Sequence, residues 1–382
     1  MSWQIIKGDA RQIPLVDNSV HCVATSPPYF GLRNYGVEGQ IGLEKTPQEY
    51  IASLVDVFRE VRRVLHPSGT LWLNLGDSYA ANRGYQVVDN KHIDVGNNHG
   101  SSVPVGFKPK DLLGIPFRVA FALQDGGWYL RSIVPWLKRN AMPESVRDRP
   151  GTAVEYVFLL SKSQRYFYDA EAVKVTSVTR DPHRPYMSEG AKELGGRSEW
   201  KSGQQRNGSD FTTRNRRNSD SFFESWQGLY SEDDEPLAFI VNPYPFKKAH
   251  FATFPPKLIE PMVKAGTSEY GCCPICLEPW ARIIERSPME IRQSNRGEMV
   301  FGNVHPTAPS GTMTKPSGVT TIGWRCNCEH KDETAIPCTV FDPFVGAGTT
   351  VLVAHQLGRS GIGLDLKEEY CQMAENRISE VG

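Results

Sequence analysis

The pentapeptide Thr25-Ser26-Pro27-Pro28-Tyr29 follows an apolar run and places fixed hydrogen-bond acceptors beside an aromatic ring. Consecutive prolines fix φ and keep the preceding residue extended, so the carbonyl groups of Ser26 and Pro27 cannot enter a helix. Acceptors of this kind can orient an exocyclic amino group and free its lone pair, while Tyr29 stacks on a flat base. A proline turn that only ends a strand is the alternative interpretation.

A second motif lies near the C-terminus, where the strand-like run 339–342 leads into a glycine-rich turn and a helical pattern. The glycines of this turn let the backbone approach a ligand closely, and the helix that follows presents free N–H groups. About 15 residues later a second strand-like run ends at Asp365, the position that takes ribose hydroxyls in a Rossmann-like fold. The pair predicts an adenosine cofactor contacted by Asp342, Phe344, Gly346, Gly348, Thr349, Thr350 and Asp365.

A nicotinamide or flavin site is the competing interpretation, because Rossmann dehydrogenases share this geometry. The motif lacks the third glycine of the dinucleotide fingerprint, since Val351 follows Thr350. A dehydrogenase also normally begins with this unit, whereas here the unit lies at the C-terminal end of the sequence. Both features oppose the dehydrogenase interpretation.

Alternating strand-like and helix-like segments must position the two motifs. Strand patterns at 3–9, 21–29 and 69–77 flank a helical pattern from about Thr46 to Leu65, in which apolar residues recur every three or four positions. This order predicts parallel βαβ units, and Pro67-Ser68-Gly69 is expected to end the helix. A second α/β stretch covers 115–163, and the polar run from 78 to about 109 indicates a long loop.

The two motifs, Thr25 to Tyr29 and Phe341 to Thr350, together resemble the β-class of DNA amino-methyltransferases. The resemblance covers nearly the whole chain outside a polar insert. It implies an α/β, Rossmann-like, S-adenosylmethionine-dependent methyltransferase fold that is circularly permuted relative to other methyltransferases. It also matches further segments to family motifs: Asp9 near the cofactor adenine, Phe254 and Pro255 in the loop around S-adenosylmethionine, and 136–143 with 148–155 in the target-base pocket. The family usually has a proline where Thr253 stands.

The resemblance implies methyl transfer from S-adenosylmethionine to the exocyclic amino group of a flipped base in double-stranded DNA, with Ser26, Pro27, Pro28 and Tyr29 as catalytic residues. A serine before Pro-Pro-Tyr goes mainly with cytosine-N4 methylation and an aspartate mainly with adenine-N6, so Ser26 favours cytosine. Adenine-N6 methylation stays open, and methylation of RNA or of a protein amide is a lesser alternative. A catalytically inactive, zinc-containing DNA-binding protein is the alternative of another class. By analogy, the class suggests a homodimer and a cognate restriction endonuclease.

Five of the eight cysteines lie between Cys272 and Cys328. The close pairs Cys273 with Cys276 and Cys326 with Cys328 can supply four thiolates for a tetrahedral structural zinc. Cys272 and His330 are alternative ligands, and unligated thiols are the competing interpretation. Four protein ligands leave no open coordination position, so this zinc is expected to fold an insertion and not to take part in catalysis.

The sequence predicts five regions: 1–176 and 335–382 as the two parts of the catalytic domain, 177–245 as a target-recognition insert, 246–269 as a cofactor-packing loop and helix, and 270–334 as a zinc-binding insertion. The arginine-rich stretch of 177–245 is also compatible with a solvated loop.

The net charge is balanced, because 43 Lys and Arg match 43 Asp and Glu, so affinity for DNA must come from local basic patches. No apolar run predicts a membrane span or a signal peptide, which favours a cytoplasmic protein with no membrane partner.

Overall fold

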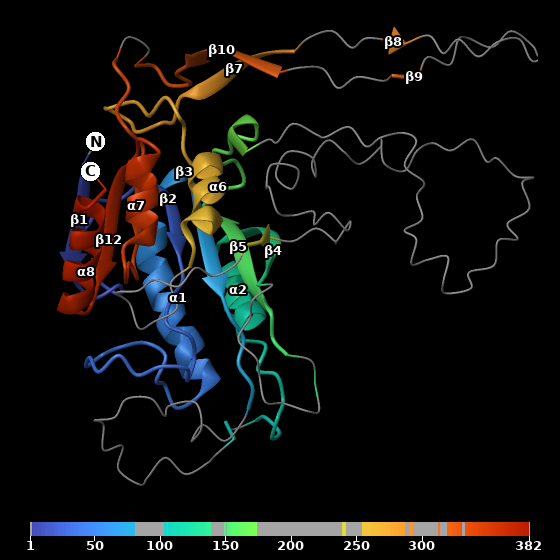
Figure 1. The fold of residues 1–382 in the computed structure, drawn as a ribbon, viewed down its shortest axis with the longest axis vertical. Helices are drawn as coiled ribbons and strands as arrows, with labels where there is room; N and C mark the ends of the chain where they lie inside the picture. The colour runs from blue at the N-terminus through green and yellow to red at the C-terminus, as the bar shows by residue number, and fades with distance from the viewer. Residues whose placement is uncertain are drawn as a thin grey trace, which may run out of the picture.

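The computed structural model describes residues 2–80, 103–104, 106–138, 149, 151–173, 239–241, 254–286, 291–292, 312–313, 319–330 and 333–381. Its centre is an eight-stranded sheet with the strand order β1-β12-β11-β2-β3-β5-β4-β6 (Figure 1). The strands are β1 Trp3–Lys7, β12 Ser360–Asp365, β11 Thr339–Asp342, β2 Val20–Thr25, β3 Leu65–Leu75, β5 Val154–Ser161, β4 Tyr129–Leu137 and β6 Phe239–Ile240. This is the Rossmann-like α/β architecture that the sequence predicts.

The two ends of the chain fold into the same half of the sheet. β1 pairs in parallel with β12, and β11 pairs in parallel with both β12 and β2. β2 continues in parallel to β3, whereas β5 runs antiparallel to β3 and to β4. The strand that carries the C-terminal glycine-rich turn therefore lies directly beside the strand that carries Ser26 to Tyr29, which is the permuted order expected from the family resemblance.

Helix α1, Pro47–Val64, follows β2 and covers one face of the sheet. A capping box begins it: the hydroxyl of Thr46 accepts from the Glu49 backbone N–H at 3.2 Å, and the Glu49 carboxylate accepts from the Thr46 N–H at 3.1 Å. Its fully buried residues include Tyr50, Leu54, Val57, Phe58 and Val61, which recur at the helical period.

Helix α1 ends within one residue of the predicted Leu65, but the residues expected to stop it lie in the next strand. Val64 is the last helical residue and Leu65 already pairs with Val20, so Pro67, Ser68 and Gly69 lie inside β3 and do not terminate the helix. The pairing of β2 and β3 shifts register between Val20 and Cys22, where the strand accommodates the proline. Strand pairing therefore stops the helix before the proline can.

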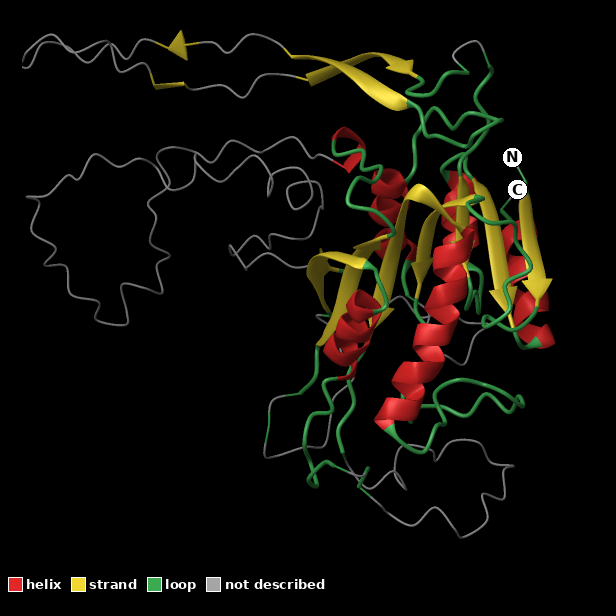
Figure 2. Cartoon of the chain, turned by 180° about the vertical axis from the view of Figure 1, so that it is seen from behind, coloured by secondary structure: helices red, strands yellow, loops and turns green. Residues whose placement is uncertain are grey.

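The remaining helices complete two layers around the sheet. Helix α2, Ile115–Asp125, packs with α1 on one face, and α6, Pro256–Gly266, packs with α7, Thr349–Gln356, on the other (Figures 1 and 2). Helix α8, Glu368–Ser379, contacts α7, β1 and β12, and a short 3-10 turn spans Glu171–Val173. Among the described residues, none of the helices combines the length and the apolar character needed to cross a membrane.

A two-stranded antiparallel ribbon extends beyond one end of the sheet. It consists of β7, Ala281–Arg286, and β10, Val319–Arg325 (Figure 2), and two further short strands, β8 Ile291–Arg292 and β9 Thr312–Met313, pair with each other. The ribbon lies within the predicted zinc-binding insertion, 270–334. Of the predicted target-recognition insert, 177–245, only residues 239–241 are described; the arginine-rich part lies outside the described residues.

Candidate functional site

A cavity of about 260 Å³ lies at the carboxyl edge of the parallel strands. Its lining includes residues 8–10 after β1, 26–29 after β2, 343–347 after β11 and 365–367 at the end of β12. These four strands are neighbours and run in parallel, so their carboxyl ends meet at one edge, where open α/β sheets bind ligands. The two motifs from opposite ends of the sequence thus face one cavity.

The antiparallel strands complete the wall on the side of Ser26 and Tyr29. Asn74 lies near the end of β3, and Glu155 lies near the start of β5, which runs in the opposite direction and therefore begins at the same edge. Trp136 pairs with Glu155 across β4 and β5, and Lys138 follows directly after β4. All four side chains line the cavity.

Tyr29 is held by a hydrogen-bond network in this wall. Its phenol donates to Glu155 Oε2 at 2.6 Å, and the Asn74 amide Nδ2 donates to the phenol oxygen at 2.9 Å and to the same carboxylate oxygen at 2.8 Å. Ser26 Oγ lies 3.3 Å from the Tyr29 hydroxyl, and the Lys138 ammonium group pairs with Glu155 Oε1. Burial, followed by the nearby Glu155 carboxylate, raises the pKa of Tyr29 well above its usual range. The phenol therefore stays a hydrogen-bond donor.

Two further features of this wall are the lack of space beside Gly76 and an unpartnered oxygen of Asn74. A Cβ atom at Gly76 would lie 2.5 Å from Cε2 of the Tyr29 ring, so only glycine leaves room for the ring in this position. The Oδ1 atom of Asn74 is buried and has no hydrogen-bond partner among the described residues. A buried acceptor without a partner is costly, and the Asn74 side chain lines the cavity.

The opposite wall is built around Asp365 and the glycine-rich turn. Asp365 Oδ2 accepts from the Gly346 N–H at 3.0 Å, and Oδ1 accepts from the Lys367 N–H at 2.9 Å. Burial raises the pKa of Asp365 despite these backbone donors. Gly346 and Gly348 have φ values of 47° and 78°, in the left-handed region that favours glycine. The carboxylate therefore fixes the turn at the cavity wall.

Asp342 lies beneath the cavity and ties the two motifs together. Its carboxylate accepts from the hydroxyl of Thr25 at 2.6 Å, from the hydroxyl of Thr350 at 2.8 Å and from the Phe344 N–H at 3.0 Å. Asp342 is 1% exposed, and this burial raises its pKa to about 6. Its contacts join β2, β11 and α7, so it supports the site from below and is not part of the lining.

The structure brings most of the predicted site residues to the cavity. The lining includes Asp9, Ser26, Pro27, Pro28, Tyr29, Phe254, Phe344, Gly346, Thr349 and Asp365. Four predicted residues lie outside the lining, namely Pro255, Asp342, Gly348 and Thr350. The Asp9 carboxylate is itself paired with the Arg11 guanidinium at 2.6 Å. Residues 250–253, which belong to the predicted loop before Phe254, lie outside the described residues.

Sequence reasoning missed Asn74, Tyr35 and Tyr370 as lining residues. Asn74 gave a usable signal, because it is the one polar residue in the run 71–75 of β3, and a buried amide in such a run requires partners. Tyr35 and Tyr370 come from a loop and a helix without any motif. Only the tertiary structure places their rings edge to face, with centroids 6.1 Å apart, at the cavity.

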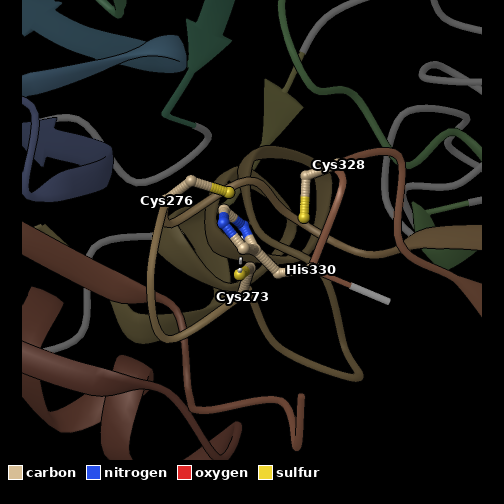
Figure 3. A group of neighbouring side chains, drawn as sticks. All are labelled: Cys273, Cys276, Cys328 and His330. Carbon is tan, nitrogen blue, oxygen red and sulfur yellow. Dashed lines mark hydrogen bonds between the residues drawn. The ribbon is translucent and has the colours of Figure 1, made fainter. Parts of the chain in front are cut away.

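A separate cluster of metal-ligand side chains lies at the base of the β7 and β10 ribbon. Figure 3 shows Cys273, Cys276, Cys328 and His330 pointing toward one another, and their ligand atoms all lie within 4.8 Å of each other. This group contains three of the four predicted ligands. His330 takes the place of Cys326, whose Sγ lies outside the group but 2.7 Å from the Sγ of Cys328.

A second cluster, formed by His21, Cys272 and Cys338, is fully buried. Both ring nitrogens of His21 already have partners: Nε2 donates to the carbonyl of Leu277 at 2.8 Å, and Nδ1 accepts from the Thr339 N–H at 2.9 Å. No nitrogen of His21 is left for a metal ion. This cluster is therefore part of the packing between the sheet and the insertion.

Comparison with known proteins places these features in a family. A family model described as DNA methylase matches residues 20–273 and 338–376. The chain is 37% identical to the type II methyltransferase M.XycI of Xanthomonas campestris pv. cyanopsidis, covering 98% of this chain and 87% of the relative. It is 34% identical to M.Cfr9I of Citrobacter freundii, with the same coverage, and 34% identical to M.SmaI of Serratia marcescens, covering 99% of this chain and 91% of the relative.

Two solved structures are also similar. A putative DNA modification methylase of Thermus thermophilus, TTHA0409, solved in complex with S-adenosyl-L-methionine, superimposes with a TM-score of 0.48 at 17% identity, covering 99% of this chain and 93% of that chain. The PvuII DNA methyltransferase, described as cytosine-N4-specific, superimposes with a TM-score of 0.47 at 17% identity, covering 100% of this chain and 91% of that chain.

Proposed function

This chain belongs to the DNA methylase family and is a DNA methyltransferase, and we propose that it methylates the N4 amino group of cytosine in double-stranded DNA with S-adenosyl-L-methionine as methyl donor. One observation carries the proposal: the wall formed by Ser26 and Tyr29 and the wall formed by Gly346 and Asp365 line the same cavity. A donor and an acceptor of a methyl group can meet only if both walls face one space.

The residues of the second wall fit S-adenosyl-L-methionine. A Cβ built at Gly346 would meet no atom closer than 3.9 Å, so the turn is open to close approach by a ligand. The Asp365 carboxylate stands where ribose hydroxyls bind in Rossmann-like folds, and Phe344 and Phe254 add apolar ring surface. S-adenosyl-L-methionine, when bound, supplies an electrophilic methyl group.

The wall formed by Ser26 and Tyr29 is the proposed binding site of the target base. A target base must leave the DNA stack, at a cost of roughly a few kcal/mol, before it can enter a cavity of this kind. The Tyr29 ring, fixed by Asn74 and Glu155, stacks on the base and recovers part of that cost. Ser26 Oγ and the Pro27 carbonyl accept from the amino group, orient it and raise the electron density of its nitrogen. Asn74 Oδ1 supplies a further buried acceptor.

The reaction needs no covalent enzyme intermediate. The lone pair of the amino nitrogen forms the new N–C bond as the methyl group leaves its donor, and the methylated amine then releases one proton. Cys338, which follows a proline as the nucleophile of cytosine-C5 enzymes does, is fully buried in the packing against His21 and does not line the cavity. The amino group itself is therefore the nucleophile.

The choice of cytosine-N4 over adenine-N6 rests on Ser26. In the β-class that this chain resembles, serine at this position goes mainly with cytosine and aspartate mainly with adenine. Digestion of DNA methylated by the purified protein, followed by mass spectrometry of the nucleosides, tests the proposal. We expect N4-methylcytosine, whereas N6-methyladenine would shift the assignment to the alternative within the class.

Calorimetry separates the proposal from a catalytically inactive DNA-binding protein. We expect the chain to bind S-adenosyl-L-methionine with one site, and failure to bind it would favour the inactive alternative.

The proposal also includes two protein partners, a restriction endonuclease and a second copy of this chain. Because the three relatives are named type II methyltransferases, we infer a cognate restriction endonuclease that recognises the same DNA sequence, and sedimentation of the purified chain will show whether it forms the homodimer suggested by analogy.

A further inference from the structure

We propose that Cys273, Cys276, Cys328 and His330 bind one structural zinc ion that fastens the base of the β7 and β10 ribbon to the catalytic sheet. The geometry suits a tetrahedral ion, because the Sγ of Cys273 lies 3.7 Å from Nδ1 of His330. Zn–S and Zn–N bonds of about 2.3 and 2.0 Å at tetrahedral angles place such a pair about 3.5 Å apart. This inference is independent of the proposed function.

The turn that carries Cys273 and Cys276 has the backbone of a metal-binding knuckle. The Ile275 N–H points at the Sγ of Cys273 at 3.4 Å, and the Leu277 N–H donates to the Cys273 carbonyl at 3.0 Å. Leu277 adopts a left-handed conformation with φ of 60°, which closes the turn. A backbone N–H directed at sulfur stabilises the thiolate, the form that binds metal. The backbone of the turn therefore suits a thiolate ligand at Cys273.

The fourth position belongs to His330 and not to Cys326. The Sγ atoms of Cys326 and Cys328 are only 2.7 Å apart. Two thiolates at separate corners of a tetrahedral zinc site lie about 3.8 Å apart, and a disulfide bond measures about 2.05 Å, so this pair matches neither arrangement. In this arrangement only one of the two sulfurs can occupy a corner, and Cys328 is the one grouped with the other three ligand atoms.

A metal ion here would crosslink the two chain segments that carry the ribbon. Cys276 lies five positions before β7, and Cys328 lies three positions after β10, where Ala281 and Arg325 form the first cross-strand pair. An isolated two-stranded ribbon is at best marginally stable in water. Stacking of Tyr270 on Trp324, with ring centroids 5.8 Å apart, gives it a small apolar base. Zinc adds binding free energy to the folded state at this point.

The same turn is bonded to the catalytic sheet. His21, in β2, donates through Nε2 to the Leu277 carbonyl at 2.8 Å, and His66, in β3, bonds through Nε2 to the Cys276 carbonyl at 3.3 Å. Both histidines lie at the amino ends of their strands, whereas the cavity lies at the carboxyl ends. The ion would therefore hold the ribbon at the edge opposite the cavity. With four protein ligands it has no open position for chemistry.

Metal analysis and X-ray absorption of the full chain test the ligand set. We expect one zinc per chain that survives dialysis against metal-free buffer, and a zinc-edge spectrum with three sulfur ligands and one nitrogen ligand. Because this spectrum needs no variant, it decides the issue even where a substitution prevents folding. Absence of bound zinc, with these cysteines open to alkylation, would overturn the site, and four sulfur ligands would overturn the role of His330.

Matched variants distinguish the zinc ligands from cysteines that do not bind the ion. Cys273→Ser and His330→Ala should each reduce zinc content by about tenfold or more after dialysis, since removing one of four ligands costs at least that much affinity. Cys326→Ser and Cys371→Ser should keep one zinc per chain. Cys371 is a buried thiol of α8 whose Sγ lies 3.7 Å from the Asp365 carbonyl, at the edge of the sheet opposite the cluster. Loss of zinc in Cys326→Ser but not in His330→Ala would reverse the assignment.

Hydrogen exchange tests whether zinc stabilises the pairing of β7 and β10. After removal of zinc with a chelator, backbone amides of β7 and β10 should exchange about tenfold faster or more, because their pairing loses its crosslink. Amides of β11 and β12, in the core of the sheet, should keep their protection. Unchanged exchange in the ribbon would mean that the ion does not hold it.

Discussion

The phenol of Tyr29 donates a hydrogen bond of 2.6 Å to the carboxylate of Glu155, although 126 positions separate the two residues. The contact exists because β5 runs antiparallel to β3 and so begins at the edge where β2 and β3 end. It fixes the one aromatic ring of the TSPPY motif at the wall of the cavity.

Replacement of Tyr29 should separate the role of its ring from that of its hydroxyl. Tyr29→Phe keeps the stacking surface but removes the bond to Glu155, so we expect a stability loss of about 1 kcal/mol and a modest fall in kcat/KM. Tyr29→Ala also removes stacking, which is worth about 1–3 kcal/mol per base, so kcat/KM should fall by a further factor of about ten to one hundred. Methylation kinetics with an oligonucleotide duplex and thermal unfolding measure both effects. Full activity of Tyr29→Ala would refute the base-stacking role.

Gly76→Ala should disturb the same ring without touching any polar group. The added methyl carbon would lie 2.5 Å from the Tyr29 ring, so the ring must move out of its network. We expect methylation to fall about tenfold or more while the protein remains folded. Gly323→Ala is the matched control, because Gly323 lies in β10 of the ribbon and a Cβ there meets no atom closer than 3.8 Å. Equal activity of the two variants would show that the position of the ring does not matter.

Ser26→Ala should lower kcat more than it changes the stability of the fold. Ser26 is partly buried at the cavity and its hydroxyl contacts Tyr29 and Asn74 at 3.3 and 3.4 Å, which are long contacts. Loss of one acceptor for the amino group should reduce kcat by about ten- to a hundredfold. Ser19→Ala, which removes an exposed hydroxyl bonded to the Val16 carbonyl, serves as control in single-turnover assays. An unchanged kcat in Ser26→Ala would remove Ser26 from the reaction.

Asp365→Ala should weaken binding of S-adenosyl-L-methionine. The substitution removes both the proposed ribose acceptor and the acceptor that holds the Gly346 N–H. Loss of a charged acceptor costs about 1.5–3 kcal/mol, which corresponds to a Kd raised by about ten- to a hundredfold in calorimetry. Asp56→Ala, which removes an exposed carboxylate paired with Arg59, should leave the Kd unchanged. Equal affinity in both variants would argue against this wall as the cofactor site.

Asp342 should make the stability of the protein fall as pH rises from about 4 to about 6. Its pKa in the folded state is raised to about 6 by burial, above the value of about 4 in an unfolded chain, so the folded state binds the proton more tightly. The stabilisation is therefore complete below pH 4 and is lost as pH rises through 6, with a size on the order of 2–3 kcal/mol.

Asp342→Asn tests this pH dependence. The difference in unfolding free energy between wild type and Asp342→Asn should change by that amount between pH 4 and pH 7 in guanidinium titrations. A difference that does not vary with pH would mean that Asp342 does not titrate in this range in the folded protein. The wild-type curve alone is not sufficient, because other carboxylates also titrate below pH 5.

Much of the fold could be predicted because local signals and topology agree. The apolar stripe of α1 and the alternation of strands and helices are properties of short segments, and the structure confirms them. The end of α1 was predicted to within one residue, but the expected cause, Pro67 to Gly69, was wrong, because the long-range pairing of Leu65 with Val20 stops the helix first.

The sequence by itself identified the two chemical motifs, because prolines and glycines set the local backbone conformation in any fold. These two motifs also identified the family. Only the tertiary structure decided which residues share the cavity. Asn74 and Glu155 join Tyr29 through an antiparallel strand, Asp342 and Thr350 lie below the lining, and His330 takes the place of Cys326 in the metal-ligand cluster. These outcomes depend on the register and direction of strands far apart in the chain, which no local pattern encodes.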